Sequence, residues 1–149
     1  MKKFKFQLET LLKVTRMNKD KAEVELAKAT KNLEEQRQLL KQYLEDMAKG
    51  QKDYDEITAK GGITVGTLMT FNSFFNWKRT QIEQQQQAIL KAQSERQACL
   101  KELVAVVNKL KSIEQLKEKR LQEYMAEMLY EEQKQLDELG GQMYFRNSG

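Results

Sequence analysis

The sequence contains no proline, no histidine and a single cysteine, Cys99. The absence of proline removes the residue that most strongly interrupts helices. One cysteine cannot form an intramolecular disulfide and cannot build a zinc site by itself. Without histidine, the commonest general base and transition-metal ligand is missing. We therefore predict a protein that binds no metal and no cofactor.

Long apolar runs are also missing. No segment approaches the roughly 20 apolar residues that a membrane-spanning helix needs. The first residues, MKKFKFQL, carry lysines but no uninterrupted apolar stretch, so they do not resemble a secretory signal. Together with the single cysteine, these features favour the reducing environment of the cytoplasm.

What the chain does contain is a long, regular apolar pattern. Charged residues make up 32% of the chain and aromatic residues 8%. Apolar and small residues recur at alternating gaps of three and four from Phe4 through Leu8 and Leu11 to Ile57, and again from Leu68 to Leu139. A disordered chain would lack such a stripe, whereas a coiled coil requires it. The pattern predicts helices over about 4–58 and 68–139.

Between the two periodic stretches lies AKGGITVGTL, residues 59–68, which contains three of the seven glycines. Gly61 and Gly62 can adopt the left-handed conformation that ends a helix, and Thr64 or Thr67 can cap the next helix. The stretch is not a phosphate-binding loop, because no lysine follows Gly66 and no strand precedes it. It predicts a turn at 59–67 that reverses the chain.

An antiparallel arrangement also suits the charges. Residues 1–31 hold nine basic and four acidic residues, and residues 121–149 hold two basic and six acidic ones, so opposite charges meet. We expect Leu8 to lie near Lys117 and Gly50 opposite Phe75, with the second helix projecting past Phe4. The predicted fold is all-α, a single antiparallel coiled-coil hairpin over 1–149, with a helix stop at Gly140-Gly141 and a flexible tail at 140–149.

This architecture argues against several function classes. Carboxylate pairs such as Glu34-Glu35 are abundant, but two paired helices offer them solvent rather than a pocket, so we predict no catalytic residue and no small-molecule substrate. Basic residues are interleaved with acidic ones, which disfavours nucleic-acid binding. Only MKKFKFQLETLLK comes close to a membrane-surface helix. A protein-interaction role remains.

The stretch FNSFFNW, residues 71–77, supports an interaction role. It places four aromatic residues within seven, and these cannot all face one partner helix. Phe71 and Phe75 are four apart and are expected between the helices, which leaves Phe74 and Trp77 as candidate docking residues. The alternative is that these two rings wrap over the turn and cover Ile63 and Val65.

Three stretches together resemble the FliJ family of bacterial flagellar export proteins. The first is the N-terminal pattern of Phe4, Phe6, Leu8, Leu11, Leu12, Val14 and Arg16. The second is the glycine-rich turn followed by Phe71, Phe74, Phe75 and Ile82-Glu83-Gln84. The third is the acidic close, Glu131-Glu132 with Asp137-Glu138. The likeness covers nearly the whole chain, in the family's order and spacing.

The resemblance implies an antiparallel coiled coil similar to the gamma-subunit stalk of rotary ATPases. It implies that the terminal segments enter the pore of the export ATPase hexamer, and that members also escort export chaperones. The residues expected to contact the ATPase are Phe4, Phe6, Leu8, Leu11, Leu12, Tyr130, Glu131, Glu132, Asp137 and Glu138.

The resemblance also implies that the start of the second helix contacts the export gate, a membrane protein. The matching positions are Phe74, Lys78, Gln81 and Gln85, to which the exposed Trp77 is added. Lys78, Gln81 and Gln85 are expected to form a polar rim beside the two aromatic rings. Lys78 and Gln81 replace apolar residues of the family, so this contact is expected to rely more on the neighbouring aromatic residues. The implied location is the cytoplasm, at the inner face of the membrane through the export apparatus. The alternative function is a coiled-coil chaperone or spacer unrelated to export.

Overall fold

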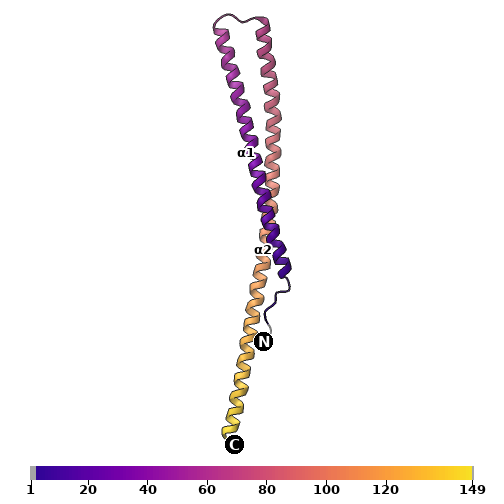
Figure 1. Ribbon diagram of the computed structural model, residues 1–149, viewed down its shortest axis with the longest axis vertical. Coiled ribbons are helices and arrows are strands. Elements are labelled where there is room, and N and C mark those ends of the chain that lie inside the picture. The colour runs from indigo at the N-terminus through magenta and orange to yellow at the C-terminus, as the bar shows by residue number, and fades with distance from the viewer. Residues whose placement is uncertain (1–2, 149) are drawn as a thin grey trace. The chain divides into compact units, whose positions relative to one another are not determined.

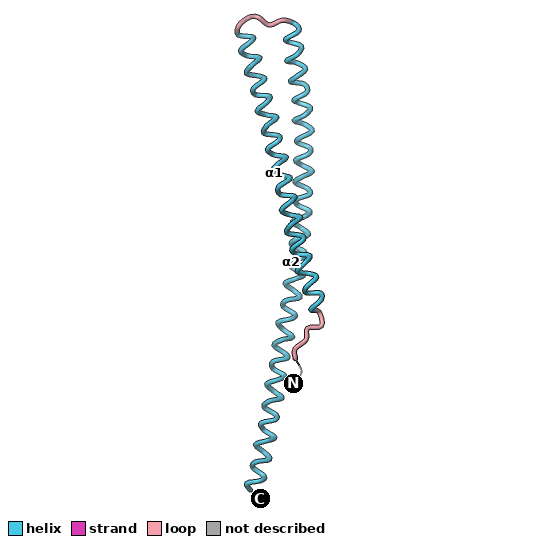
Figure 2. Tube along the Cα trace, viewed as in Figure 1, coloured by secondary structure: helices cyan, strands magenta, loops and turns pink. Residues whose placement is uncertain are grey.

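A computed structural model describes residues 3–148 of the chain, which form two helices, α1 (Glu9–Ala59) and α2 (Val65–Ser148). Figures 1 and 2 show the two helices joined by one short loop. The described residues contain no strand. The predicted all-α helical hairpin is therefore confirmed.

The chain divides into two compact units, each containing a segment of both helices. The turn unit consists of Lys21–Val104, and the terminal unit consists of Met1–Asp20 with Ala105–Gly149. In each unit the α1 and α2 segments run antiparallel, because contacts pair rising residue numbers of α1 with falling numbers of α2.

The glycine-rich turn has the chemistry that the sequence predicts. Gly61 adopts a positive φ of 71°, and its amide bonds the Thr58 carbonyl at 3.1 Å just past the end of α1. The Thr64 hydroxyl accepts a hydrogen bond from the Thr67 amide at 3.1 Å and so caps α2. The helix starts at Val65 instead of the predicted residue 68, because the cap is supplied by Thr64, the earlier of the two predicted capping residues.

The first helix begins later than predicted, at Glu9 instead of residue 4. The Leu8 carbonyl accepts a hydrogen bond from the Leu12 amide at 2.9 Å, and residues 3–6 are not helical. Two residues apart in a helix, Phe4 and Phe6 would point in nearly opposite directions. In the non-helical arm both rings pack inward, Phe4 against Tyr124 and Phe6 in the core.

The second helix also ends later than predicted. It continues through Gly140-Gly141 to Ser148, so the predicted flexible tail is wrong for residues 140–148, and Gly149 lies outside the described residues. A glycine in a helix interior costs about 1 kcal/mol relative to alanine but does not forbid helical dihedrals. Neither glycine takes the positive φ that would end the helix.

The terminal unit is held by an apolar core. Phe6 and Leu12 from the N-terminal segment pack with Leu110 and Ile113 of α2, and all four are buried. The apolar pattern of the sequence predicts Leu11 at this face, but Leu11 is 37% exposed and Leu12 is fully buried. Beside this core the Lys117 ammonium lies 2.9 Å from the Glu9 carboxylate, one residue from the predicted meeting of Leu8 and Lys117.

The turn unit has a different kind of interior. Its buried apolar residues are Ala22, Leu33 and Ala92, two of which are small. Near the turn, the Tyr54 ring packs edge-on against Phe71 and Phe75, with centroids 5.4 and 6.3 Å away, as expected for rings between the helices. We call the face on which α1 and α2 meet in each unit the seam.

Adjacent leucines test the observed core of the terminal unit. Leu12→Ala removes a fully buried side chain and should lower the free energy of unfolding by about 2–5 kcal/mol. Leu11→Ala is the matched control and should cost about 1 kcal/mol or less, because its side chain is partly solvated. Urea denaturation followed by circular dichroism measures both. Equal losses would contradict the observed start and rotation of α1.

Candidate functional site

Neither helix within residues 3–148 has a stretch that is both long enough and apolar enough to cross a membrane. In the same part of the chain, no three His, Cys, Asp or Glu side chains gather closely enough to hold a metal ion. The candidate sites are surfaces, one in each unit.

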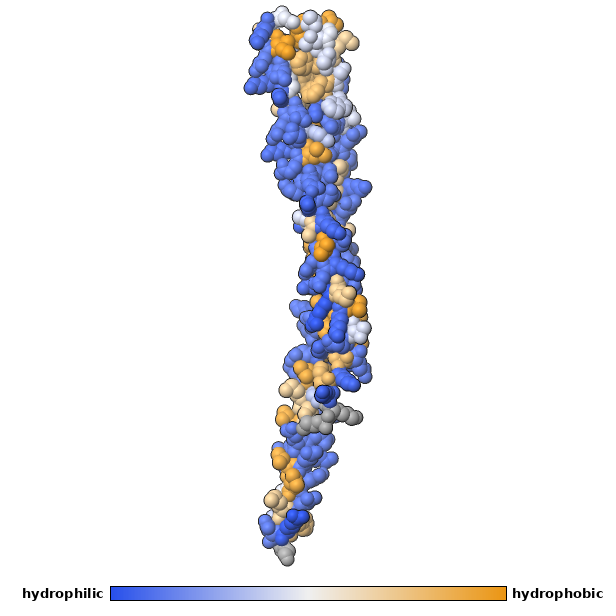
Figure 3. Space-filling view, viewed as in Figure 1, coloured by the Kyte–Doolittle hydropathy of each residue, from blue (hydrophilic) through white to orange (hydrophobic). Residues whose placement is uncertain are grey.

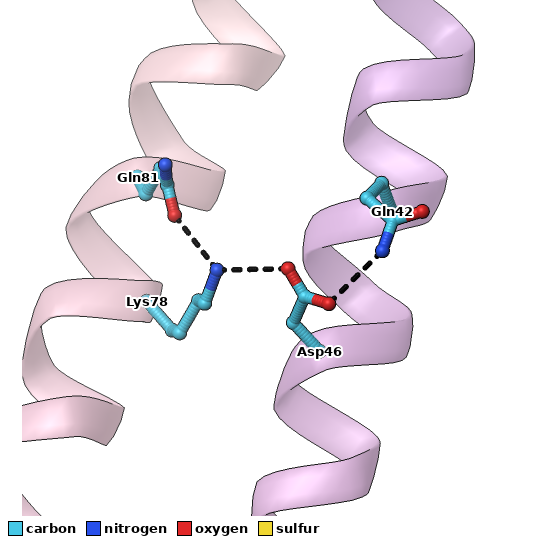
Figure 4. Close-up of polar contacts among 4 residues, drawn as sticks. All are labelled: Gln42, Asp46, Lys78 and Gln81. Atoms are coloured by element: carbon cyan, nitrogen blue, oxygen red, sulfur yellow. Dashed lines mark hydrogen bonds and ion pairs between the residues drawn. The ribbon is translucent and has the colours of Figure 1, made fainter.

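The surface in the turn unit is built around Lys78. This side chain is only 5% exposed, and its ammonium donates hydrogen bonds to Asp46 at 3.0 Å and Gln81 at 3.1 Å (Figure 4). Asp46 in turn accepts a hydrogen bond from Gln42 at 3.0 Å. The ammonium is thus held between α2, which carries it, and the carboxylate of α1.

Three aromatic rings complete the surroundings of the ammonium. Its nitrogen lies 4.8 Å from the ring centroid of Trp77, 5.1 Å from that of Tyr43 and 5.9 Å from that of Phe74. These distances are within the range of cation–π attraction, which strengthens where water is excluded. We call Lys78, Asp46, Gln81 and the three rings the lysine cage.

The lysine cage changes the roles predicted for the gate-contact residues. Lys78 and Gln85 were expected at a solvent-exposed polar rim, but both are buried in the seam. The Gln85 side-chain amide donates to the backbone carbonyl and to the side-chain oxygen of Gln36, each at 2.8 Å. Gln81 is half-buried and engaged with Lys78. Lys78 and Gln85 therefore do not form an exposed rim, because these side chains already have partners on the hairpin itself. Their contact with the gate, and that of Gln81, stays a prediction.

Phe74 and Trp77, the two candidate docking residues, differ in their exposure to solvent. Phe74 was expected to be free, but it is half-buried and its ring lies over Gly50, where a β-carbon would overlap it. Gly50 was expected opposite Phe75, so the observed contact is shifted by one residue. Trp77 is 59% exposed, as predicted. Neither ring covers Val65, which is 75% exposed.

The exposed side of Trp77 borders a shallow groove between the two helices. The groove has a volume of about 300 Å³ and is lined by Asp46, Lys49, Gly50, Asp53, Phe74, Trp77 and Lys78. Gly50 contributes no side chain, so the indole and the Phe74 ring form its apolar part. Because α1 and α2 both line it, the groove depends on their pairing. We call it the Trp77 surface.

The second candidate surface lies in the terminal unit. Of the residues predicted to contact an ATPase, Phe6 and Leu12 are buried in the core, and Phe4 and Leu8 are half-buried against it. These four side chains therefore pack within the terminal unit, and Leu11 is the exposed member of the N-terminal set. The C-terminal members are all exposed on α2: Tyr130, Glu131, Glu132, Asp137 and Glu138.

Every residue of α2 from 129 to 147 is exposed. Apolar side chains in and just before this segment follow spacings of three and four, with Glu132 completing the pattern; they are Met125, Leu129, Leu136, Leu139 and Met143. Apolar surface is visible near the C-terminal end in Figure 3. We call these residues the C-terminal stripe. Such spacing places them on one helix face that no described residue covers.

The N-terminal arm and α2 border a groove of about 630 Å³ in the terminal unit. Lys3 and Lys5 line one side, and Glu127, Glu131 and Glu132 line the other, as the opposite charges of the two chain ends predict. Phe4 and Met128 provide its apolar lining. Glu131 and Glu132 thus lie both beside the arm and at the start of the exposed segment.

Sequence reasoning did not identify Asp46 and Tyr43 as partners of Lys78. The signal was present in the antiparallel register, which places residues near 46 opposite residues near 78 once the turn is fixed. An acidic residue on one helix and a lysine on the other at such positions favour an ion pair. The burial of the pair is not visible in the sequence, because it depends on rings contributed by both helices.

A family model described as "Flagellar FliJ protein" matches residues 4–149, essentially the whole chain. Among curated proteins and among solved structures, none showed significant similarity to the chain.

The lysine cage has a measurable electrostatic signature. The hydrogen bond from Lys78, followed by that from Gln42, lowers the pKa of Asp46 from its usual 3.8. A carboxyl with a lowered folded-state pKa contributes stability above its unfolded pKa, and this contribution is lost as the pH falls through the folded pKa. Lys78→Met should therefore raise the pKa of Asp46 and flatten the stability profile below about pH 4.

Carboxyl-carbon NMR across an acid titration measures this pKa directly. Glu9, whose pKa is lowered mainly by its hydrogen bond from Lys117 in the terminal unit, serves as the internal reference, and Lys78→Met should leave its titration unchanged. An Asp46 titration curve that Lys78→Met leaves unchanged would show that the ion pair does not form in solution.

Proposed function

Because the chain belongs to the FliJ family and so has a role in flagellar protein export, we propose that it is a non-enzymatic stalk and adaptor of the export apparatus. In this proposal the terminal unit contacts the export ATPase and promotes its assembly and activity. The turn unit contacts the export gate. The protein acts in the cytoplasm, at the inner face of the membrane through its partners.

The observation that carries the ATPase contact is the exposed end of α2. The segment from 129 to 147 presents an apolar stripe together with acidic side chains, and it contributes nothing to the buried core of the described residues. An exposed apolar face of this kind is typical of a helix that lies in a partner's groove. Leu11, exposed on the N-terminal segment, adds to the same contact.

The Trp77 surface supports the gate contact. Tryptophan is among the residues most enriched at binding hot spots, and here its indole is exposed while the cage holds one side of it. An anchor that is already ordered loses less conformational entropy on binding. Phe74 supports this surface from beneath, through its contact with Gly50. We assign direct gate contact to Trp77 first and an indirect role to Lys78 and Gln85.

Truncation of α2 tests the ATPase contact. Removing residues 130–149 should abolish most of the stimulation of ATP hydrolysis by the export ATPase, because the exposed segment is lost. The melting curve should change little, since no residue in 129–147 is buried. ATPase titration and circular dichroism measure the two effects. Full stimulation by the truncated chain would refute the contact.

Point variants locate the contact on the helix. Leu136→Ser with Leu139→Ser changes the C-terminal stripe and should weaken ATPase binding by about tenfold or more. Gln133→Ser with Lys134→Ser is the matched control, because these exposed neighbours lie off the stripe. Equal weakening by both pairs would show that helix formation alone, and not the stripe, is what the ATPase requires.

Trp77→Ala tests the gate contact. Removing a central aromatic anchor typically costs about 2 kcal/mol or more of binding free energy, so we expect gate binding to weaken by roughly thirtyfold. The melting temperature should fall only slightly, because most of the indole is in solvent. Met69→Ala, at another exposed apolar residue of α2, is the control and should leave binding unchanged. Calorimetric titration with the purified cytoplasmic part of the gate measures both, and unchanged binding by Trp77→Ala would exclude this anchor.

A further inference from the structure

The turn unit contains a charge where a paired helix ordinarily places an apolar side chain. Lys78 is the one buried ionisable residue among the described side chains. Removing a charge from water costs several kcal/mol, which a good ion pair only partly offsets, and well-packed apolar replacements are often as stable or more so. Stability alone therefore does not account for a lysine here. A polar residue at a seam position can instead specify the register of two helices.

Tyr43, one of the two partners of Lys78 on α1, belongs to a set with regular spacing. Gln36, Tyr43 and Gly50 are seven residues apart, so they occupy equivalent positions in successive heptads. Each carries a different chemistry and meets a different residue of α2. Gln36 pairs with Gln85 through two hydrogen bonds, the Tyr43 ring lies against the Lys78 ammonium, and Gly50 accommodates the Phe74 ring.

A slip of one heptad would break every one of these matches. In one direction Ile57 would replace Gly50 beneath Phe74, where a single β-carbon already has no room. The same slip would put Gly50 in place of Tyr43 beside the ammonium, although Asp53 would take the place of Asp46. In the other direction Tyr43 would take the place of Gly50, and Leu39 would replace Asp46 opposite the buried ammonium. Uniform leucines along the seam would oppose neither slip, because all heptads would then be equivalent, and the register would depend on the turn.

We propose that Lys78 is a positioning residue, which together with the pairs Gln36–Gln85 and Gly50–Phe74 fixes the register of α1 against α2 in the turn unit and holds the Trp77 indole in one orientation. The role in register follows from the contacts of Gln36, Tyr43 and Gly50 with α2. Its consequence for binding rests on the proposed function, because the Trp77 surface is lined by both helices. A slipped register would present a different groove to the gate.

The single tryptophan of the chain makes the register observable. Trp77 labelled as 5-fluorotryptophan should give one ¹⁹F NMR line in the full chain. Lys78→Met with Asp46→Leu should give two or more lines, since alternative registers become populated, while the melting temperature stays the same or rises. Lys78→Arg, made alone in the native chain, retains the charge opposite Asp46 and should still give a single line.

Two further double variants serve as a second test and as a control. Gln36→Leu with Gln85→Leu removes a neutral match without touching the lysine cage and should also multiply the Trp77 lines. Arg16→Met with Glu114→Leu removes a surface ion pair of the terminal unit and should leave one line. A single line in both turn-unit double variants would overturn the proposal. So would several lines in the Arg16 control, or line multiplication that accompanies a loss of helical signal.

Gate binding separates this proposal from the function on which it partly rests. If Trp77→Ala weakens gate binding, each register variant with several lines should weaken it too. The loss of affinity should follow the fraction of ¹⁹F signal that has left the native line position. If Trp77→Ala has no effect on gate binding, the gate assignment fails while the ¹⁹F result still decides the register. Native gate affinity in a variant with several Trp77 lines, when Trp77→Ala does weaken binding, would overturn the link between register and binding.

Discussion

Two paired helices can bury only the side chains that lie between them, and the other features of this protein depend on that constraint. No second layer covers the outer faces of either helix in the described residues. Most side chains therefore remain in solvent, and each seam position has a large effect on stability and on register. A residue that leaves the seam becomes available for binding, whereas one that enters it becomes part of the fold.

The two units use their seams differently. The terminal unit buries Phe6, Leu12, Leu110 and Ile113, so apolar burial supplies most of its stability. The turn unit buries small residues and uses directional contacts, namely the lysine cage, the Gln36–Gln85 hydrogen bonds and the fit of Phe74 over Gly50. Apolar burial is non-directional, whereas hydrogen bonds and a glycine–ring fit are satisfied in one alignment. The two units thus combine stability with specificity.

The same constraint separates candidate binding residues from structural ones. Trp77 and the segment from 129 to 147 lie outside the seams, and they carry exposed apolar surface beside charged groups. Phe6, Leu12, Lys78 and Gln85 lie within the seams, although family resemblance assigned them to contacts with partners. In this chain their direct effect is on the pairing of the helices. Their substitution would therefore alter binding through the shape of the surface that the pairing creates.

The periodicity of the sequence determined the helices, the turn and the antiparallel pairing. Alternating gaps of three and four require one apolar face on each helix, and Gly61 with Thr64 supplies the local chemistry that ends one helix and starts the next. These features are local in the chain, so sequence alone was sufficient. The Leu8–Lys117 expectation came within one residue of the observed Glu9–Lys117 ion pair, because the position of the turn sets which residues of the two helices meet.

Only the tertiary structure decided which neighbour in the sequence is buried. Leu11 and Leu12, or Phe74 and Phe75, differ by about 100° around a helix, so a small rotation exchanges their environments. That rotation is set by side chains of the other helix, such as Leu110 against Leu12 and Gly50 against Phe74. The burial of Lys78 likewise needs Asp46 and Tyr43 from α1. Periodicity in one helix contains no information about these distant partners.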